Sequence, residues 1–465
     1  MNGWIGGRLR AVPVLVWMVL IALALRVAVI PFDTIENLMG ADHVMLHVWA
    51  PGNVARSIVA GRGFGSSFFS DQPGATTPPV FPYVVAVFFR LFGVYNSQSI
   101  FAIHVFDSVI NSLACIPILF IARRSYGPRM GLWAAWAWVF FPYGIYFSAA
   151  WAWSTHLLLL GLLWLLYLAQ EMEVSPRIGL WAGFGLLAGV TALDEPSVLI
   201  VIPFLLALAA LRLALAGKRW VVPGVVASVA LAAAISPWLI RDAVVFHKFI
   251  PIRGNMGLEL WLGNNGQNVR WVSDDLNPLN NQAELAEYNR VGEVAYMEHK
   301  ERQAKEYIHD HRGWYAWMCV RRAVYLWTGY WSFDPAYLAE ESMDPANIPF
   351  ATSMTLLGIA GLFLSWREKP FEAIRYGGVL FLYPITYYFS HPEPYFLRAI
   401  DPLLVILGCY AVMRFLERRR RRALGGVNSS TGAESRSAEG TGSGSEQSRS
   451  IATPAPIRTR SLLES

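Results

Sequence analysis

The sequence has little charge and few cysteines. Of its 465 residues, 15% are Asp, Glu, Lys or Arg and 55% are hydrophobic, whereas a soluble domain carries about 25% charge. This shortage of charge argues for a protein that lies in lipid. The three cysteines, Cys115, Cys319 and Cys409, stand far apart, so they indicate neither a disulfide framework nor a metal site.

The net charge of +5 comes largely from basic residues at loop ends and from the run Arg418–Arg422. A basic cluster directly after an apolar helix typically fixes membrane topology and contacts anionic lipid. We therefore expect contacts with membrane lipids and no nucleic-acid partner.

Apolar runs recur from one end of the chain to the other, and a helix needs about 20 apolar residues to cross a bilayer. We predict an all-α, polytopic bundle of about 10–12 transmembrane helices. No A-x-A-like cleavage site follows the run Ala11–Ile30, so we expect an uncleaved first helix. The predicted spans are Val12–Ile30, Ser99–Ala122, Gly131–Phe147, Thr155–Ala169, Ile178–Leu193, Val198–Leu215, Val221–Leu239, Phe350–Ser365, Ile374–Phe389 and Ala399–Phe415.

Basic clusters fall between alternate pairs of these runs and should lie inside by the positive-inside rule. Both termini are then cytoplasmic, and two long polar loops, 31–98 and 240–347, lie outside. Pro79–Phe92 and Trp314–Trp331 should be helices at the outer interface rather than spans. The membrane domain is expected to cover residues 1–416. Residues 417–465 should form a basic anchor and, after Leu424, a disordered cytoplasmic tail.

The first outer loop contains several acids and two histidines within a short distance: Asp33, Glu36, Asp42, His43 and His47. Acids beside the end of a span are either solvated loop residues or a base that faces a membrane-embedded substrate. A helix over Asn53–Ala60 should follow, and the glycines of GRGF predict a turn.

Four sequence strings carry a resemblance to a known family. In chain order they are GNVARSIVAGRGF, TTPPVFPYVVAVFFRLFG, SPWLIRDAVVFHKFIPIRGNMGLELWLGNN and HPEPYFLRAIDPLLVIL. Their order, spacing and shared side of the membrane resemble the GT-C membrane glycosyltransferases, which include protein mannosyltransferases, aminoarabinose transferases and Rgt-type sugar transferases. The resemblance covers about residues 10–416.

The resemblance implies a sugar donor linked to polyprenyl phosphate and an acceptor hydroxyl on a glycan, a lipid or a protein. In the family a first-loop acid deprotonates the acceptor, and the sugar inverts. A hydroxyl nucleophile needs such a base, and arginine can hold the charge of the departing phosphate. The resemblance also implies a bacterial inner membrane. Some relatives use a divalent metal and others do not, so a metal remains open.

The sequence departs from the family pattern at the catalytic acid. Relatives carry acids just before the alanine-bearing helix, where this chain has His47 and Ala50. Three interpretations stay open: Asp42 acts through a shifted loop, His47 is the base, or the site is altered or inactive. His titrates near neutral pH, so it is chemically able to serve. Asp33 and Glu36 complete the first-loop candidates.

Further candidates lie in other outer segments. Asp194 and Glu195 interrupt an apolar hairpin. They mark a helix end, or they supply a second active-site acid or a metal contact. Asp401 could pair with a neighbouring arginine. The candidates for binding the donor phosphate are Arg398, Arg56, Arg241 and Arg253.

We therefore expect a glycosyltransferase that acts at the outer face of the membrane. The alternatives are a GT-C scaffold without catalysis and a transporter or flippase of lipid-linked sugars. A transporter should show repeats or paired broken helices in mid-membrane, and the sequence shows neither.

Overall fold

The computed structural model describes residues 14–31, 49–68, 70–267, 273–333, 335, 338, 344–393 and 395–438. These residues form helices and no strand, which confirms the expected all-α membrane fold. The chain divides into two compact units, Met1–Val412 and Met413–Ser465.

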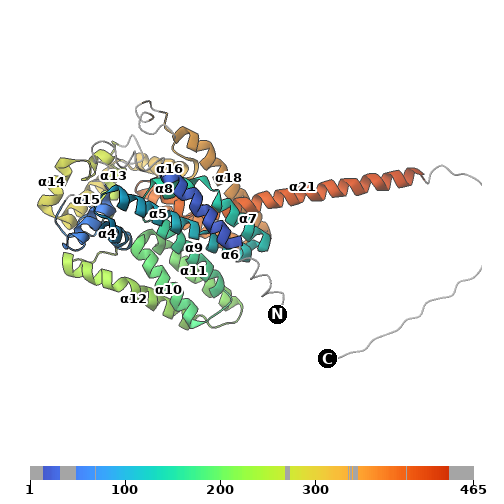
Figure 1. Cartoon of the computed structure of the whole chain (residues 1–465), viewed down its shortest axis with the longest axis horizontal. Coiled ribbons are helices and arrows are strands. Elements are labelled where there is room, and N and C mark those ends of the chain that lie inside the picture. The colour runs from blue at the N-terminus through green and yellow to red at the C-terminus, as the bar shows by residue number, and fades with distance from the viewer. Residues whose placement is uncertain are drawn as a thin grey trace, which may run out of the picture. The chain divides into compact units, whose positions relative to one another are not determined.

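The first unit contains almost all of the helices (Figure 1). After a first helix, Val14–Pro31, they are α3 (Ala50–Val59), α4 (Val80–Phe92), α5 (Ser97–Leu113), α6 (Cys115–Tyr126), α7 (Pro128–Val139), α8 (Pro142–Ala150), α9 (Thr155–Met172), α10 (Ile178–Asp194), η1 (Pro196–Ile200), α11 (Val201–Leu215), α12 (Val221–Phe246), α13 (Met256–Gly263), η2 (Asp274–Leu276), α14 (Gln282–Val291), α15 (Glu293–Asp310), α16 (Arg312–Thr328), α18 (Asp344–Glu368), α19 (Pro370–Leu382), α20 (Ile385–Phe389), η3 (Phe396–Ala399) and the first part of α21 (Asp401–Ala438).

Six helical segments among the described residues are long and apolar enough to cross a membrane, and each coincides with a predicted span. They are Val14–Pro31, Ser97–Tyr126, Thr155–Met172, Pro196–Leu215, Val221–Phe246 and Pro345–Glu368. The predicted span at 178–193 is the shorter apolar helix α10.

Two other predicted spans, which are not among these six segments, are each divided into two shorter helices. The run Gly131–Phe147 forms α7 and α8, and the break falls just before Pro142. The run Ile374–Phe389 forms the end of α19 and all of α20, with Pro384 between them. Proline has no N–H to donate and its ring clashes with the preceding turn, so a helix readily ends there. The prediction of two unbroken spans was therefore wrong.

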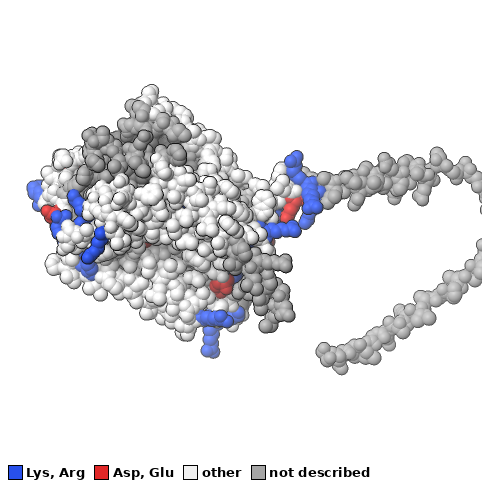
Figure 2. All heavy atoms as spheres, viewed as in Figure 1, with Lys and Arg blue, Asp and Glu red and all other residues white. Residues whose placement is uncertain are grey.

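Long helices of the first unit expose apolar side chains. Val221, Val225 and Val229 on α12 and Ile359 and Phe363 on α18 are each more than half exposed. Figure 2 shows a visible face of this unit that is mostly uncharged, with Lys and Arg gathered towards its edges. Lipid tails solvate such a surface, whereas water would not.

The two long loops that the sequence predicts to lie outside, called the outer loops below, pack against each other and against the membrane helices. In the first loop, α3 and α4 share a core formed by Ala55, Phe81, Val85, Ala86, Phe89 and Ile103. Phe68, also from the first loop, is buried among residues of α13, α14 and α15 from the large loop. Figure 1 shows α13–α15 grouped at the same end of the unit as α4.

Helix α21 extends to Ala438 and so passes Leu424, where we expected disorder to begin. The run of arginines followed by Ala423 and Leu424 consists of residues that favour helix, and no proline interrupts them. The expectation of a disordered tail stays a prediction. Residues 439–465 lie outside the described residues.

Candidate active site

A polar cavity of about 190 Å³ lies where the two outer loops meet the ends of α9 and α10. Most of its lining residues belong to segments that the sequence predicts to lie on the outer side. The polar and aromatic residues that line it include Ser67, Thr76, Thr77, Trp153, Ser154, Thr155, Asp194, Glu195, Arg253, Asn255, Glu259, Tyr387, His391, Glu393 and Tyr395.

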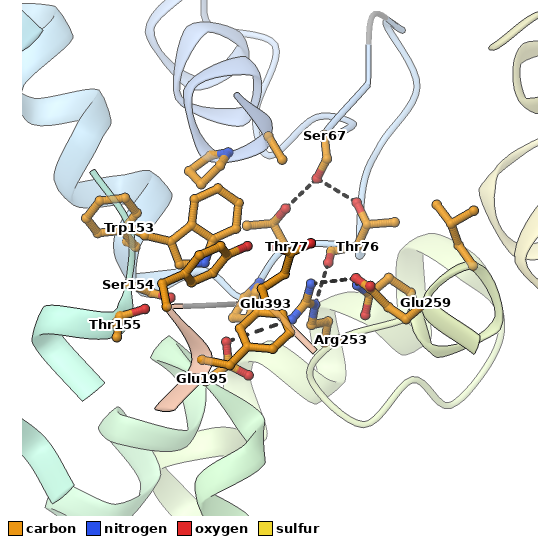
Figure 3. A pocket seen from close by; sticks show the side chains of 18 of the residues that line it. Ser67, Thr76, Thr77, Trp153, Ser154, Thr155, Glu195, Arg253, Glu259 and Glu393 are labelled. Carbon is orange, nitrogen blue, oxygen red and sulfur yellow. Dashed lines mark hydrogen bonds and ion pairs between the residues drawn. The ribbon is translucent and has the colours of Figure 1, made fainter. Parts of the chain in front are cut away.

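Arg253 joins three walls of this cavity (Figure 3). Its Nε donates a 3.0 Å hydrogen bond to the carbonyl oxygen of Thr76. Its Nη2 donates to Glu259 Oε1, also at 3.0 Å, and its Nη1 lies 3.8 Å from Glu195 Oε2. One guanidinium group thus connects the first loop, the large loop and the end of α10.

Glu195 is held between the end of α10 and Pro196, which begins η1. Burial raises the pKa of the Glu195 carboxyl above its ordinary value, the charge of Arg253 lowers it, and Glu259 raises it again. The net direction is upward. Glu195 therefore holds a proton more readily than an exposed glutamate, a property expected of a group that transfers protons.

Glu259 and His391 meet because two backbones approach closely. A Cβ atom at Gly263 would lie 2.0 Å from the carbonyl oxygen of Ser390, so only glycine allows the end of α13 to lie against this segment. Glu259 Oε2 then lies 3.3 Å from His391 Nε2. The Glu259 carboxylate also accepts a hydrogen bond from Asn255 Nδ2.

Helix α16 stabilises the contact between α13 and the segment that contains His391. Its Arg322 is buried and donates to Asn264 Oδ1 at 3.0 Å, to the carbonyl oxygen of Phe389 at 3.3 Å and to that of Gly263. A cation at the carbonyl ends of α13 and α20 is favoured by their dipoles. Arg322 is one of the charges for which residues 314–331 were not predicted to span the membrane. Its charge instead binds carbonyl oxygens inside the protein.

Hydroxyl groups form another wall. Thr76 Oγ1 donates to Ser67 Oγ at 2.6 Å, and Ser67 Oγ is also hydrogen-bonded to the hydroxyl of Thr77. Ser154 and Thr155 line the cavity at the start of α9. These groups can donate or accept hydrogen bonds, which suits a ligand with several hydroxyls.

Aromatic rings complete the cavity. The rings of Tyr387 and Phe396 are stacked, with centroids 4.4 Å apart. The ring centroids of Tyr395 and Trp153 lie 5.7 Å apart. The cavity therefore offers apolar ring faces next to carboxylates and hydroxyls, and it can receive a ligand with both kinds of surface.

The predicted first-loop candidates Asp33, Glu36, Asp42 and His47 lie outside the described residues. The described chain resumes just before α3, and Ala50 and Pro51 of this helix line the cavity. The predicted second acids Asp194 and Glu195 both line it as well.

Of the four predicted phosphate-binding arginines, only Arg253 lines this cavity. Arg241 instead donates to the carbonyl oxygens of Gly74 at 2.7 Å and Phe64 at 2.9 Å. It also forms a 2.7 Å ion pair with Asp242. The structure thus gives Arg241 a clear role in holding the first loop.

Arg398 and Arg56 are not among the residues that line this cavity. Arg398 forms a 3.2 Å ion pair with Asp401, which confirms the expectation that Asp401 pairs with an arginine. Its guanidinium carbon lies 4.0 Å from the centroid of Tyr143, beside a separate, smaller cavity. Arg56 is partly buried on α3.

Sequence reasoning missed polar residues inside the protein and in the cavity wall. Glu259 lies within a quoted motif but was not singled out. Asp107, in the span Ser97–Tyr126, is fully buried, and neither of its carboxylate oxygens has a hydrogen-bond partner among the described residues. An acid inside an apolar run was the signal that could have found Asp107, because such residues are rare and often functional.

No three side chains of His, Cys, Asp or Glu in the described part of the chain are arranged to hold a metal ion.

Comparison with known proteins supports the family resemblance. A family model described as dolichyl-phosphate-mannose-protein mannosyltransferase matches residues 76–240, roughly a third of the chain. No curated protein matches the sequence.

Solved structures are similar to the chain at low sequence identity. The apo oligosaccharyltransferase of Archaeoglobus fulgidus is similar at 14% identity and a TM-score of 0.50, over 89% of this chain and 52% of that one. Oligosaccharyltransferase AglB from the same organism, in complex with an inhibitory peptide and a dolichol-phosphate, has 15% identity and a TM-score of 0.49, over 88% and 51%. ArnT from Cupriavidus metallidurans, bound to undecaprenyl phosphate, has 15% identity and a TM-score of 0.34, over 89% and 78%.

The chain spans about half the length of the archaeal oligosaccharyltransferases. The family match and the shared fold together confirm the resemblance to the GT-C membrane glycosyltransferases that the sequence motifs indicated.

Proposed function

We propose that the protein takes a sugar from a polyprenyl phosphate at the outer face of the membrane. It passes the sugar, with inversion, to a hydroxyl of a glycan, a lipid or a protein. The observation that carries this proposal is the cavity between the two outer loops, where carboxylates, hydroxyls and one arginine converge. The description of the matching family names a dolichyl-phosphate mannose as the donor and a protein as the acceptor.

The reaction forms a bond between the acceptor oxygen and C1 of the sugar and breaks the bond between C1 and the phosphate oxygen. The acceptor proton passes to a carboxylate, which acts as general base. The electron pair of the broken bond leaves with the polyprenyl phosphate, whose charge a guanidinium group can stabilise. Every group that this reaction needs has a candidate in the outer loops.

The base is proposed to be Asp42. It precedes Ala50 by eight residues, and an extended chain covers about 3.3 Å per residue, so its position in sequence leaves it within reach of the cavity that Ala50 lines. Among the acids predicted from the sequence, Glu195 and Asp194 are described by the structure, line the cavity and could replace it. The raised pKa of Glu195 supports it as the next candidate.

Arg253 is proposed to hold the leaving phosphate. Its two carboxylate partners already balance its charge, so it can turn towards a phosphate only if one of these contacts lengthens. The 3.8 Å contact with Glu195 is the weaker of the two and is expected to give way. Donor binding should then depend on the protonation state of Glu195.

The test measures sugar transfer and donor binding separately in purified protein reconstituted in lipid. Asp42→Asn should lower the transfer rate about 10²–10⁴-fold, as expected for a lost base, yet leave donor binding unchanged. The matched variants are His47→Ala, Asp33→Asn, Glu36→Gln, Asp194→Asn and Glu195→Gln. If all first-loop variants transfer sugar at the parental rate, the first loop does not supply the base.

A further inference from the structure

A buried glutamate connects the large outer loop to the first loop behind the cavity wall. Glu293 is the first residue of α15 and is only 5% exposed. Its Oε1 accepts a hydrogen bond from the backbone N–H of Ala75 at 2.5 Å. Its Oε2 accepts one from the hydroxyl of Tyr288 at 2.8 Å, and that hydroxyl lies 2.9 Å from Ser66 Oγ.

These contacts hold the chain on both sides of the hydroxyl wall. Ala75 directly precedes Thr76 and Thr77, and Ser66 directly precedes Ser67. The carbonyl oxygen of Ala75 accepts a further hydrogen bond from the N–H of Gly254, at 2.7 Å. The peptide groups of Ala75 are therefore fixed entirely by the large loop.

We propose that Glu293 is a positioning residue, which latches the large outer loop onto the first loop and so fixes the Thr76–Thr77 wall of the cavity. Glu293 does not itself line the cavity and takes no part in the transfer step described above. The latch is a property of the two loops, and only its effect on transfer rests on the proposed function.

The latch should respond to pH. Burial raises the pKa of Glu293 to about 7, although its hydrogen bonds with Tyr288 and Ala75 and the charge of Arg241 lower it. Asp242 acts in the same direction as burial. When the loops separate, water reaches Glu293 and its pKa returns towards the ordinary value of 4.5.

The sign of the pH effect follows from these two values. A group whose pKa is raised in the closed state favours that state at low pH, and the advantage is lost as pH rises from 4.5 through about 7. Between pH 5 and pH 7 separation of the loops should become about 40-fold more favourable. Above pH 7 little further change is expected.

Glu293→Gln is the matched test variant because it cannot ionise yet keeps both hydrogen bonds. Its amide oxygen can accept from Ala75, and its amide nitrogen can donate to Tyr288, whose hydroxyl then donates to Ser66. Tyr288→Phe is the control that leaves Glu293 ionisable. It removes a hydrogen bond that lowers the Glu293 pKa, so it should move the pH window upward without abolishing it.

The experiment is hydrogen–deuterium exchange on the full-length protein in lipid nanodiscs, with the peptide containing Ala75 followed at pH 5 and pH 7. Comparison of the parent and Glu293→Gln at the same pH removes the intrinsic pH dependence of exchange. The ratio of parent to variant exchange should rise by roughly 40-fold from pH 5 to pH 7. An equal ratio at the two pH values would overturn the proposal.

Transfer assays give a second readout. The ratio of the parental rate to the Glu293→Gln rate should fall as pH rises from 5 to 7, whereas a merely structural role would lower the variant's rate by the same factor at each pH. Equal factors would contradict the positioning role. If the parent protein transfers no sugar, only the proposed glycosyltransferase activity is contradicted. The latch is tested independently by hydrogen–deuterium exchange.

Discussion

Replacing Arg253 tests the electrostatic arrangement of the cavity directly. Arg253→Ala removes the hydrogen bonds to Thr76 and Glu259 and the ion pair with Glu195. It leaves two partly buried carboxylates without their counter-cation. Breaking a buried pair costs about 3–5 kcal/mol, and a hydrogen bond to a charged group contributes about 1.5–3 kcal/mol.

Solvent access reduces this cost. The side chains of Arg253, Glu259 and Glu195 are 29%, 25% and 15% exposed, so water can reach part of each group. We expect Arg253→Ala to lower the free energy of unfolding by about 2–4 kcal/mol. Arg253→Lys should have a smaller effect, because it retains the charge but loses the fork of donors.

The loss of stability in Arg253→Ala should depend on pH. Arg253 lowers the pKa of Glu195, so its removal raises that pKa further. A group with a raised pKa contributes stability that is present at low pH and lost as pH rises. The difference in thermal midpoint between parent and Arg253→Ala should therefore be larger at pH 8 than at pH 5.

Adding Glu195→Gln removes one stranded carboxylate. The double variant should recover part of the stability lost in Arg253→Ala. Its loss in free energy of unfolding should be smaller than the sum of the losses in the two single variants. Two results together would refute the argument that Arg253 and Glu195 interact: an equal loss in thermal midpoint at pH 5 and pH 8, and additive losses of stability in the double variant.

Two further predictions concern donor binding and topology. Because Arg398 lies outside the main cavity, Arg398→Ala should weaken binding of a polyprenyl-phosphate sugar less than Arg253→Ala does; an equal or larger loss of affinity would assign the phosphate to Arg398. A reporter fused after Arg422 should be active in the cytoplasm, and activity only on the outer side would overturn the assignment of every outer loop.

The helical membrane fold could be predicted from the sequence because long apolar runs and basic clusters are local signals. Six predicted spans coincide with long apolar helices. The predicted spans were wrong at Pro142 and Pro384, where apolar composition continues but the helix ends. A prediction from hydrophobicity alone takes no account of the backbone N–H that proline lacks.

The site was only partly predictable. Arg253, Asp194 and Glu195 stood out as charges in outer segments, and all three line the cavity. Glu259 and Glu293 did not stand out, since their importance arises from contacts with residues far away in sequence. Arg241 carried a similar signal to Arg253, but its donors are occupied by the backbone of the first loop. Which arginine faces a cavity depends on tertiary packing.

The most direct test of the proposed function is a transfer assay with the purified protein in liposomes, supplied with a polyprenyl-phosphate sugar and acceptors of each class. The account predicts release of polyprenyl phosphate in equal amount to the sugar transferred, with an inverted anomeric bond. Both should be reduced in Arg253→Ala. Binding of the donor by the parent protein without any transfer would contradict it and indicate a scaffold that binds lipid-linked sugars without catalysis.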